Sequence, residues 1–280
     1  MSDRRDVFAF AGRVCVVTGA ASGIGAALAH ELARRRAVLV LVDRDAVGMA
    51  RVAGSARELG APDVSAYDID LSDGGDRLDL AAEVVARHGG VDLLINNAGV
   101  TLMGSFEQNS MADFDWLLEI NLHAVVRMTK AFLPHLLARP GSHVVNVSSL
   151  FGLIAPAGQV AYVTSKFAVR GFTDALRNEL EPRGVGVTVV HPGGIKTNIA
   201  ARARLSGGDP AGEQAAQAAK FEERALTMPA EEAAKQILTA IQRRRPRLVI
   251  GGVARAADVL ARITPTRYWK IAQRAGKRLT

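Results

Sequence analysis

Three polar side chains near the middle of the sequence have the types and spacing that proton transfer requires. Tyr162 and Lys166 are four residues apart, so on a helix they share one face. An isolated phenol has a pKa of about 10, and an ammonium group beside it favours the phenolate and lowers that pKa. Ser149 ends an apolar run, and its hydroxyl can orient a carbonyl or an alcohol beside the phenol oxygen. Together these side chains predict a site that moves a proton to or from a substrate oxygen.

A glycine-rich segment near the N-terminus has the composition of a turn that binds a diphosphate. The sequence TGAASGIG at 18–25 connects an apolar run at 13–19 to a stretch with helical spacing. Glycines allow a tight turn and close approach of the backbone, and the following helix N-terminus offers free N–H groups. This context favours a dinucleotide-binding turn over a plain glycine-rich connector. The predicted contacts come from Gly19, Ser22, Gly23, Ile24 and Gly25.

An acidic residue follows this turn at the distance expected of a group that binds the adenosine ribose. Asp43 ends the second apolar run, 18 residues after Gly25. A carboxylate there would repel a 2′-phosphate, so the sequence favours NAD over NADP. The neighbouring Arg44 leaves NADP open, because a guanidinium group can accept that phosphate. Asp43 and Arg44 are therefore the residues predicted to set the coenzyme.

Strands and helices that can position these residues alternate along the chain. Apolar runs typical of strands covered on both faces occur at 13–19, 37–43, 66–70, 91–100, 142–148, 184–197 and 247–250. Between them, helices are predicted after the glycine turn, at 45–59, from Ser72 or Asp73 onward, at 110–138, through 162–181 and at 229–243. The alternation predicts an α/β fold, a doubly wound parallel β-sheet flanked by helices (a Rossmann fold). It forms a single domain, residues 1–250, with a C-terminal helical extension.

Composition narrows the class of protein further. The chain has 280 residues, 49% of them hydrophobic, which is ample for a large core. No run of about 18 apolar residues occurs, and the N-terminal segment lacks a signal-peptide core, so a cytoplasmic protein without a transmembrane helix is predicted. Cys15 is the only cysteine and is expected to be a small buried side chain. No metal site is predicted.

The net charge of +7 comes from the C-terminal part of the chain. From Arg243 onward, eleven Lys and Arg accompany one acid, Asp258, whereas residues 1–242 hold 24 basic and 27 acidic side chains. The charge of the main domain therefore gives no support to nucleic-acid binding.

The tail at 251–280 is predicted to be helical at 253–263, to break at Thr264-Pro265, and to end in a basic amphipathic helix. Such a helix can make peripheral contact with an anionic membrane, although packing on its own domain or a partner subunit is more common.

Taken in order, the motifs resemble those of the classical short-chain dehydrogenase/reductase (SDR) family, over roughly residues 10–250. They are TGAASGIG at 18–25, Asp70, NNAG at 96–99, Asn121, Ser149, YVTSK at 162–166 and PGGIKT at 192–197. The resemblance implies that Tyr162 is the general acid/base and that Ser149 positions the substrate oxygen. Lys166 would lower the phenol pKa and hold the nicotinamide ribose. Asn121 would support a water-linked proton relay that ends at Lys166.

The resemblance also extends the cofactor site beyond the glycine turn. It implies that Asp70 touches the adenine, that Asn97 lies along the cofactor, and that Thr197 holds the nicotinamide carboxamide with the backbone around Ile195. The implied set is Asp70, Leu71, Asn97, Ala98, Gly99, Tyr162, Lys166, Pro192, Gly193, Ile195 and Thr197.

The predicted activity is hydride transfer between a nicotinamide cofactor and an alcohol or ketone. A hydrophobic substrate, lipid- or steroid-like, is expected because the candidate pocket walls are apolar. These walls are Leu150, Phe151, Leu153, Ile154, Val160 and the insertion at 198–228, which is expected to act as a lid. Two alternatives remain, an NADPH-dependent carbonyl reductase and a catalytically silent dinucleotide sensor or scaffold. The resemblance further implies a homodimer or homotetramer packed through helices at 110–138 and 161–181.

Overall fold

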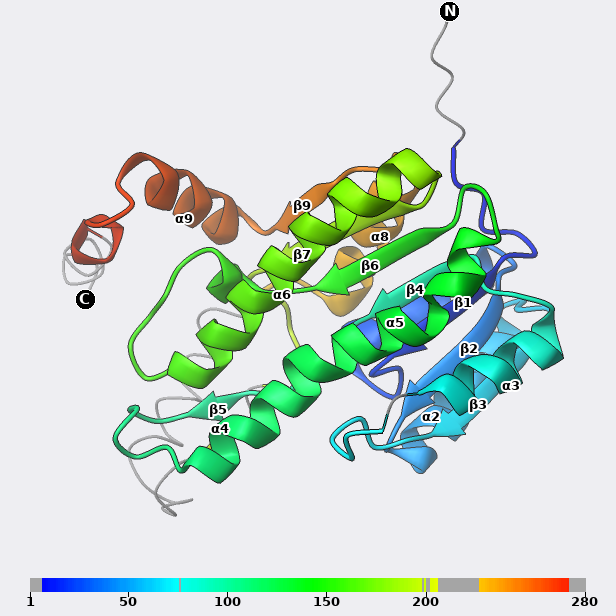
Figure 1. Ribbon diagram of the computed structural model, residues 1–280, viewed down its shortest axis with the longest axis horizontal. Helices are drawn as coiled ribbons and strands as arrows, with labels where there is room; N and C mark the ends of the chain where they lie inside the picture. The colour runs from blue at the N-terminus through cyan, green and yellow to red at the C-terminus, as the bar shows by residue number, and fades with distance from the viewer. Residues whose placement is uncertain (1–6, 76, 198, 200–201, 206–226, 272–280) are drawn as a thin grey trace, which may run out of the picture.

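A parallel sheet forms the centre of the molecule (Figure 1). The computed structural model describes residues 7–75, 77–197, 199, 202–205 and 227–271. Seven strands pair in the order β3-β2-β1-β4-β6-β7-β9, and every neighbouring pair is parallel. The strands are β1 (Val14–Thr18), β2 (Val38–Asp43), β3 (Val64–Asp68), β4 (Leu93–Asn96), β6 (His143–Val147), β7 (Gly186–Pro192) and β9 (Arg247–Ile250). The order proceeds outward in both directions from β1 and β4, which confirms the predicted doubly wound sheet.

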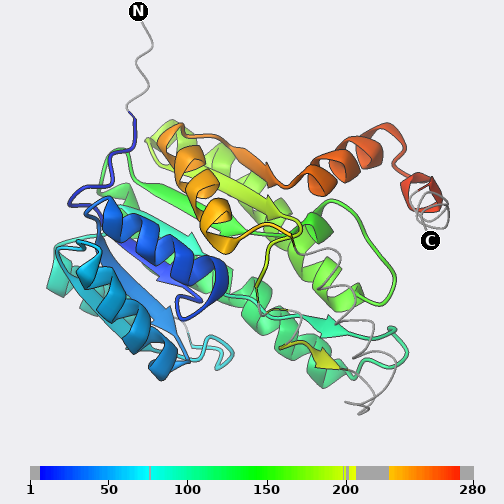
Figure 2. The ribbon, with the colours of Figure 1, turned by 180° about the vertical axis from the view of Figure 1, so that it is seen from behind.

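Helices cover both faces of this sheet, because parallel strands must be joined by crossovers. The layer in front in Figure 1 contains α3 (Leu78–His88), α5 (Ala124–Leu137) and α6 (Val160–Leu180). The layer in front in Figure 2 contains α1 (Gly23–Arg34), α2 (Ala46–Glu58) and α8 (Ala230–Gln242). The sheet therefore lies between two helical layers, as predicted.

Alternate residues of β1 pack against opposite helical layers. Cys15 and Val17 belong to the core cluster that includes residues of α1, α2 and α8. Val14 and Val16 belong to the cluster that includes residues of α3, α5 and α6. Full burial of each valine stabilises the fold by about 1.5–3 kcal/mol. This packing explains the unbroken apolar run, confirms that Cys15 is buried, and fixes the end of β1 from which the glycine turn departs.

The segment after β3 differs from the prediction. α3 begins at Leu78 and not near Ser72. Gly74 (φ +76°) and Arg77 (φ +69°) adopt the left-handed conformation, which interrupts a right-handed helix. The Asp70 carboxylate accepts hydrogen bonds from the backbone N–H (2.9 Å) and the hydroxyl (2.8 Å) of Ser72. Asp70 therefore caps the turn that precedes α3.

The long helix predicted at 110–138 is present but contains one irregular turn. α4 (Met111–Leu118) continues into α5 through a π-helical turn at Glu119–His123. A π turn widens the helix by one residue and is frequent at functional sites. Asn121 lies at its centre, so the irregular turn sets the direction of this buried amide.

The C-terminal extension begins with α9 (Gly252–Ile263), which projects from the body in Figure 1. It ends just before Thr264, as predicted. The second helix was predicted over 267–280. Residues 268–271 are helical, and the remainder of that prediction, 272–280, lies outside the described residues. No helix that the structure describes has the length and apolar content needed to span a bilayer.

A second, two-stranded sheet was not predicted. β5 (Leu102–Met103) pairs in parallel with β8 (Arg204–Leu205). The predicted lid at 198–228 otherwise lies mostly outside the described residues. Its end is held by a backbone hydrogen bond of 2.8 Å from the N–H of Lys196 to the carbonyl of Met228.

Candidate active site

A cleft of about 560 Å³ opens where the parallel strands end. Ligands of open α/β sheets bind at this carboxyl edge. The predicted residues that line the cleft are Gly19, Ser22, Gly23, Ile24, Asp43, Arg44, Asp70, Leu71, Asn97, Ala98, Gly99, Ser149, Tyr162, Lys166, Pro192, Gly193, Ile195 and Thr197. Gly25 and Asn121 do not line it. The fold thus gathers motifs from the whole length of the domain around one space.

The turn between β1 and α1 requires glycine at three positions. Gly19 (φ +65°) and Gly23 (φ +54°) adopt the left-handed conformation, which disfavours other residues. A Cβ on Gly25 would lie 2.0 Å from the carbonyl oxygen of Gly19, so Gly25 packs the helix against the turn. Gly23 and Ile24 at the N-terminus of α1 therefore face the cleft, an arrangement that suits a diphosphate.

Asp43 lies at the end of the cleft near the glycine turn, where its carboxylate bonds to the backbone of two loops. Its carboxylate accepts hydrogen bonds from the N–H groups of Ala21 (3.0 Å) and Asp45 (3.1 Å). Arg44 donates to Asp70 at 3.5 Å in an exposed ion pair. Exposed pairs of this kind contribute little stability, so the Arg44 guanidinium remains available to another anion. This end of the cleft thus presents both a carboxylate, from Asp43, and a guanidinium group, from Arg44.

Asn97 joins the loops that follow β1 and β4. Its side-chain amide donates to the carbonyls of Thr18 (3.0 Å) and Gly19 (3.3 Å). The Thr18 hydroxyl in turn accepts from the backbone N–H groups of Asn97 and Ala98, both at 3.0 Å. The NNAG motif therefore lines the cleft and also holds the loops after β1 and β4 together.

Tyr162 and Lys166 lie at the start of α6 and meet Ser149 at the end of β6. The Lys166 Nζ atom lies 5.6 Å from the Tyr162 ring centroid and donates to the carbonyl of Val147 at 3.2 Å. The hydroxyls of Tyr162 and Ser149 are hydrogen-bonding neighbours. Tyr162 and Lys166 are only 9% and 3% exposed. The three side chains predicted to act together are thus brought together in a site largely shielded from water.

The electrostatics of this group differ from the prediction. Burial raises the pKa of Tyr162 above its ordinary value, and hydrogen bonding with Ser149 opposes this shift without reversing it. Burial also lowers the pKa of Lys166 to about 8. The predicted lowering of the phenol pKa by the ammonium is therefore wrong for the protein chain alone. Desolvation acts on both groups, and the Lys166 Nζ lies over the ring rather than bonded to the phenol oxygen.

Asn121 is fully buried behind the cleft. Its Oδ1 atom accepts from the N–H of Val100 (2.8 Å), and its Nδ2 atom donates to the Val100 carbonyl (2.9 Å) and the Ser165 hydroxyl (3.1 Å). A Cβ on Gly99 would lie 3.2 Å from the Lys166 Nζ and 3.3 Å from the Asn121 Oδ1. Asn121 and Lys166 therefore flank one glycine. Because its amide bonds are all internal, Asn121 ties α6 to the loop after β4.

The substrate end of the cleft is only partly the one predicted. Leu150 and Phe151 line it, whereas Leu153, Ile154 and Val160 do not. Leu153 is packed inside and Val160 is exposed. A 3₁₀ turn directly after Ser149 redirects the chain, so the later apolar residues face away from the cleft.

Three wall residues, Met103, Trp116 and Gln159, were missed by sequence reasoning, whereas Ile199, Arg202 and Arg204 belong to the insertion at 198–228 that was predicted as a wall. The Arg204 guanidinium lies 4.0 Å above the Trp116 ring and 2.7 Å from the Asp113 carboxylate. The pairing of β5 with β8 brings Arg204 there from a distant part of the chain. Strands of two residues have no periodic pattern, so the sequence carries no signal for this pairing or for the contacts of Arg204 with Trp116 and Asp113.

The motif order and the fold match a known family. Residues 13–206 match the model for short chain dehydrogenases. The chain belongs to the short-chain dehydrogenase/reductase family. It is 43% identical over 264 residues, 94% of each chain, to SadH of Mycobacterium tuberculosis, a protein named as an oxidoreductase.

Solved structures of the SDR family share this fold. One from Burkholderia phymatum, in complex with NAD, has a TM-score of 0.84 at 31% identity and covers 92% of this chain and 95% of its own. One from Burkholderia cenocepacia, in complex with NADP, has a TM-score of 0.74 at 29% identity and covers 89% of this chain and 100% of its own. The protein is thus an NAD(P)-dependent oxidoreductase that acts on a small molecule.

Proposed function

We propose that this SDR enzyme transfers hydride between NAD and a hydrophobic secondary alcohol or ketone, with Tyr162 as the general acid/base. The observation that carries the proposal is the convergence of Tyr162, Ser149 and Lys166 at the buried end of the cleft. A general acid/base must lie within hydrogen-bond reach of the proton that it transfers. This group is the one place in the predicted site where a substrate oxygen can meet a hydroxyl pair and an amine.

The cofactor end of the cleft has the groups that a dinucleotide needs. Gly19 and Gly23 line the cleft, and the N-terminus of α1 offers N–H donors to a diphosphate there. Asp43 would accept hydrogen bonds from the ribose hydroxyls, and Thr197 and the backbone at Ile195 would hold the carboxamide. NAD bound there would supply the hydride acceptor or, when reduced, the donor.

The side chains of this enzyme then handle the proton. Tyr162 accepts it from an alcohol and donates it to a ketone, while the Ser149 hydroxyl orients the substrate oxygen. Because burial raises the pKa of Tyr162, the neutral phenol is the resting form, and it donates its proton to a ketone. For alcohol oxidation the phenol first loses that proton to solvent, and the phenolate then accepts the proton of the alcohol. The Lys166 ammonium stabilises the phenolate as it forms. Asn121, held beside Lys166, supports the water-linked relay that returns the proton to solvent.

NAD is proposed as the preferred coenzyme because the Asp43 carboxylate faces the cleft at the end of β2. A negative charge there disfavours a 2′-phosphate. The alternative, carbonyl reduction with NADPH, is supported by Arg44, whose exposed guanidinium has only a 3.5 Å contact with Asp70. A ratio of rates with the two coenzymes decides between these readings.

The test is a panel of secondary alcohols and ketones of increasing hydrophobic length, each assayed with NAD(H) and with NADP(H) by nicotinamide absorbance. We expect turnover that rises with hydrophobic length and is faster with NAD(H). Turnover with NADP(H) alone would support the carbonyl reductase. Dinucleotide binding without turnover of any substrate would overturn the proposal in favour of a silent sensor.

We also propose that the enzyme is a homodimer or homotetramer built through α4, α5 and α6. Apolar side chains are exposed on these helices, namely Met111, Val126, Val160 and Phe167. Contiguous exposed apolar patches mark association surfaces, and we propose that these side chains belong to one. Sedimentation velocity should show a dimer or tetramer, and a monomer at micromolar concentration would contradict this assembly.

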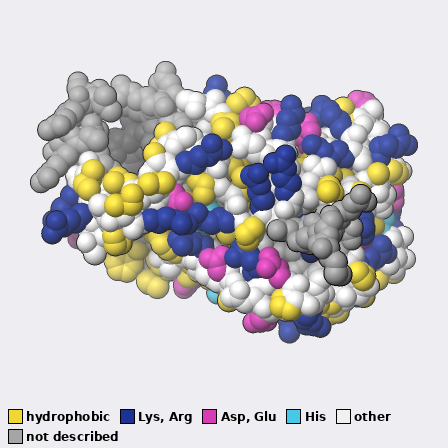
Figure 3. Space-filling view, turned by 90° about the horizontal axis from the view of Figure 1, so that it is seen from above, with side chains coloured by type: hydrophobic (Ala, Val, Ile, Leu, Met, Phe, Trp, Pro, Cys, Tyr) yellow, Lys and Arg dark blue, Asp and Glu magenta, His cyan; other side chains and the backbone are white. Residues whose placement is uncertain are grey.

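We propose that the protein is cytoplasmic and that its tail at 251–280 makes peripheral contact with a membrane. α9 exposes Val253, Val259 and Ile263. Figure 3 shows hydrophobic side chains gathered toward the left, the side on which α9 lies in Figure 1, with Lys and Arg nearby. Basic and apolar groups together favour anionic lipid surfaces. The full chain should float with phosphatidylserine vesicles and its Val259→Glu, Ile263→Glu variant should not; equal flotation would exclude this contact.

A further inference from the structure

A buried histidine lies directly behind the backbone of Ser149. His191 belongs to β7, next to β6, and is 0% exposed. Its Nδ1 atom lies 3.0 Å from the carbonyl oxygen of Ser149. A carbonyl oxygen can only accept a hydrogen bond, so Nδ1 must carry the proton. The geometry therefore fixes the tautomer of this ring.

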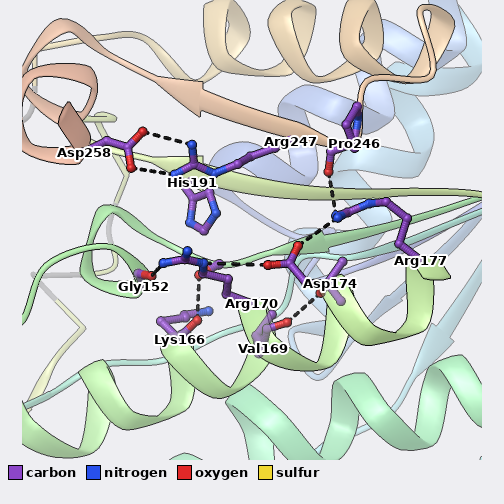
Figure 4. A network of polar contacts seen from close by, with 12 residues as sticks. Gly152, Lys166, Val169, Arg170, Asp174, Arg177, His191, Pro246, Arg247 and Asp258 are labelled. Carbon is purple, nitrogen blue, oxygen red and sulfur yellow. Dashed lines mark hydrogen bonds and ion pairs between the residues drawn. The ribbon is translucent and has the colours of Figure 1, made fainter. Parts of the chain in front are cut away.

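The other nitrogen of the ring is isolated. The Nε2 atom of His191 is buried and has no hydrogen-bond partner among the described residues. Burial lowers the pKa of His191 to about 4, so the ring is neutral at physiological pH. It lies between the Arg247–Asp258 pair of β9 and α9 and the Arg170–Asp174 pair of α6 (Figure 4). A neutral ring with one donor can serve only the Ser149 carbonyl.

The Ser149 carbonyl belongs to a turn whose position sets the active site. It also accepts the N–H of Gly152 at 3.0 Å, while the Ser149 hydroxyl accepts the N–H of Phe151 at 3.1 Å. A Cβ on Gly152 would lie 2.8 Å from the Lys166 carbonyl, so the turn is pressed against α6. A shift of this turn would move the Ser149 hydroxyl relative to Tyr162.

We propose that His191 is a positioning residue for the reaction: its Nδ1–H saturates the Ser149 carbonyl and holds the Ser149 hydroxyl in register with Tyr162. The catalytic part of this inference rests on the proposed function. The internal bond from Gly152 remains when the imidazole is removed, so loss of His191 should loosen the turn without unfolding it. A misplacement of about 1 Å in a catalytic group can reduce the rate about 100-fold.

A second buried histidine in the same sheet offers a matched control. His143 is the first residue of β6, at the end of the strands away from the cleft, and is also 0% exposed. Its Nε2 atom lies 2.8 Å from the Thr188 hydroxyl, which itself donates to the carbonyl of Arg245 at 2.6 Å. The hydroxyl proton is thereby used, so His143 must donate from Nε2. The two histidines are therefore assigned opposite tautomers.

The first experiment needs no substrate. Long-range ¹H–¹⁵N spectra of histidine-labelled protein, assigned with His191→Asn and His143→Asn variants, report which ring nitrogen carries the proton. We expect Nδ1–H for His191 and Nε2–H for His143, both neutral at pH 7. An Nε2–H or a doubly protonated ring for His191 would overturn the proposal, whatever the enzyme proves to act on.

The second experiment separates positioning from packing. His191→Asn keeps an N–H donor where Nδ1 lies, whereas the amide of His191→Gln extends to the position of Nε2 and His191→Leu has no donor. We expect kcat to fall about 10- to 100-fold in the Gln and Leu variants, with KM for the dinucleotide unchanged, and to stay within about threefold in the Asn variant.

His143→Leu should lower the unfolding temperature to a similar extent as His191→Leu while leaving kcat unchanged. Equal kcat in His191→Asn and His191→Gln would reduce His191 to a packing residue. If no panel substrate is turned over by the wild-type protein, the proposed function fails, while the tautomer measurement still decides whether His191 holds Ser149.

Discussion

The parallel strands all begin at one edge of the sheet, the amino edge, and all end at the other, the carboxyl edge. Buried polar side chains have opposite uses at these two edges. At the amino edge, the Asp92 carboxylate is fully buried and bonded to the Arg13 guanidinium (2.7 Å) and the N–H of Val14 (2.9 Å). These groups bond to one another and fasten β1 to β4. At the carboxyl edge, Tyr162 and Lys166 are almost as buried, yet both line a cleft. The first edge maintains the fold, and the second retains groups that can bond to a ligand.

The direction of the helices explains this difference. Helix C-termini meet the amino edge and leave unpaired carbonyls and negative dipole ends there. Arginines satisfy these carbonyls: Arg139 donates to Gly89 at 2.7 Å, and Arg244 donates to Gly184 at 2.9 Å. Helix N-termini meet the carboxyl edge and leave N–H donors that suit an anionic cofactor. The same parallel topology thus separates stability from chemistry.

Tyr162→Phe should produce the largest effect at the carboxyl edge. Loss of a general acid/base lowers turnover by about 10² to 10⁴-fold. Dinucleotide binding, followed by fluorescence, should persist, and the unfolding temperature should change little because the ring remains packed. Rates like those of the wild type would remove Tyr162 from its proposed role.

Lys166 makes the stability of the protein depend on pH in a specific direction. Its pKa is about 8 in the folded chain against an ordinary value of 10.5, so between these values the unfolded state binds more protons. The free energy of unfolding should therefore rise with pH across this window, by up to about 3 kcal/mol from this group. The buried Cys15 thiol, whose pKa is raised by burial, acts in the opposite direction in both proteins. In urea unfolding at both ends of the window, the stability of the wild type relative to that of Lys166→Met should therefore rise with pH. An equal pH dependence of the free energy of unfolding in the two proteins would contradict the lowered pKa of Lys166.

Asp92→Ala tests the amino edge. It removes the partner of Arg13 and leaves the N–H of Val14 unbonded, which should lower the free energy of unfolding by about 2–3 kcal/mol. The kcat of the remaining folded enzyme should be unchanged, because the cleft lies at the other edge. A variant of wild-type stability with reduced kcat would reverse the assignment of the two edges.

Asp43 should produce the smallest of these effects, on coenzyme choice. Asp43→Asn removes the charge and keeps an oxygen for the N–H of Ala21, while its amide nitrogen cannot accept from the N–H of Asp45. It therefore tests repulsion of the 2′-phosphate at the loss of one of the two backbone bonds. The ratio of kcat/KM for NAD over NADP should fall about tenfold, a free-energy difference of about 1.4 kcal/mol. Asp43→Ala should lower the same ratio and also the stability. If neither variant changes the ratio, another group sets the preference.

The order of strands and helices could be predicted because it depends on local patterns. Apolar runs bounded by turns identify buried strands, and the glycines at 19 and 23 need a backbone conformation that few other residues adopt. The carboxyl edge of a parallel sheet then brings the strand ends together without further information. For the same reason, most of the predicted site residues line one cleft.

The sequence by itself thus determined the sheet, the glycine turn and the pairing of Tyr162 with Lys166. Only the tertiary structure decided the start of α3, the π turn that presents Asn121, the wall around Arg204, and the direction of the Tyr162 pKa shift. These features depend on which groups meet across long separations in the chain and on how much water each one loses. Neither quantity is contained in the spacing of residue types.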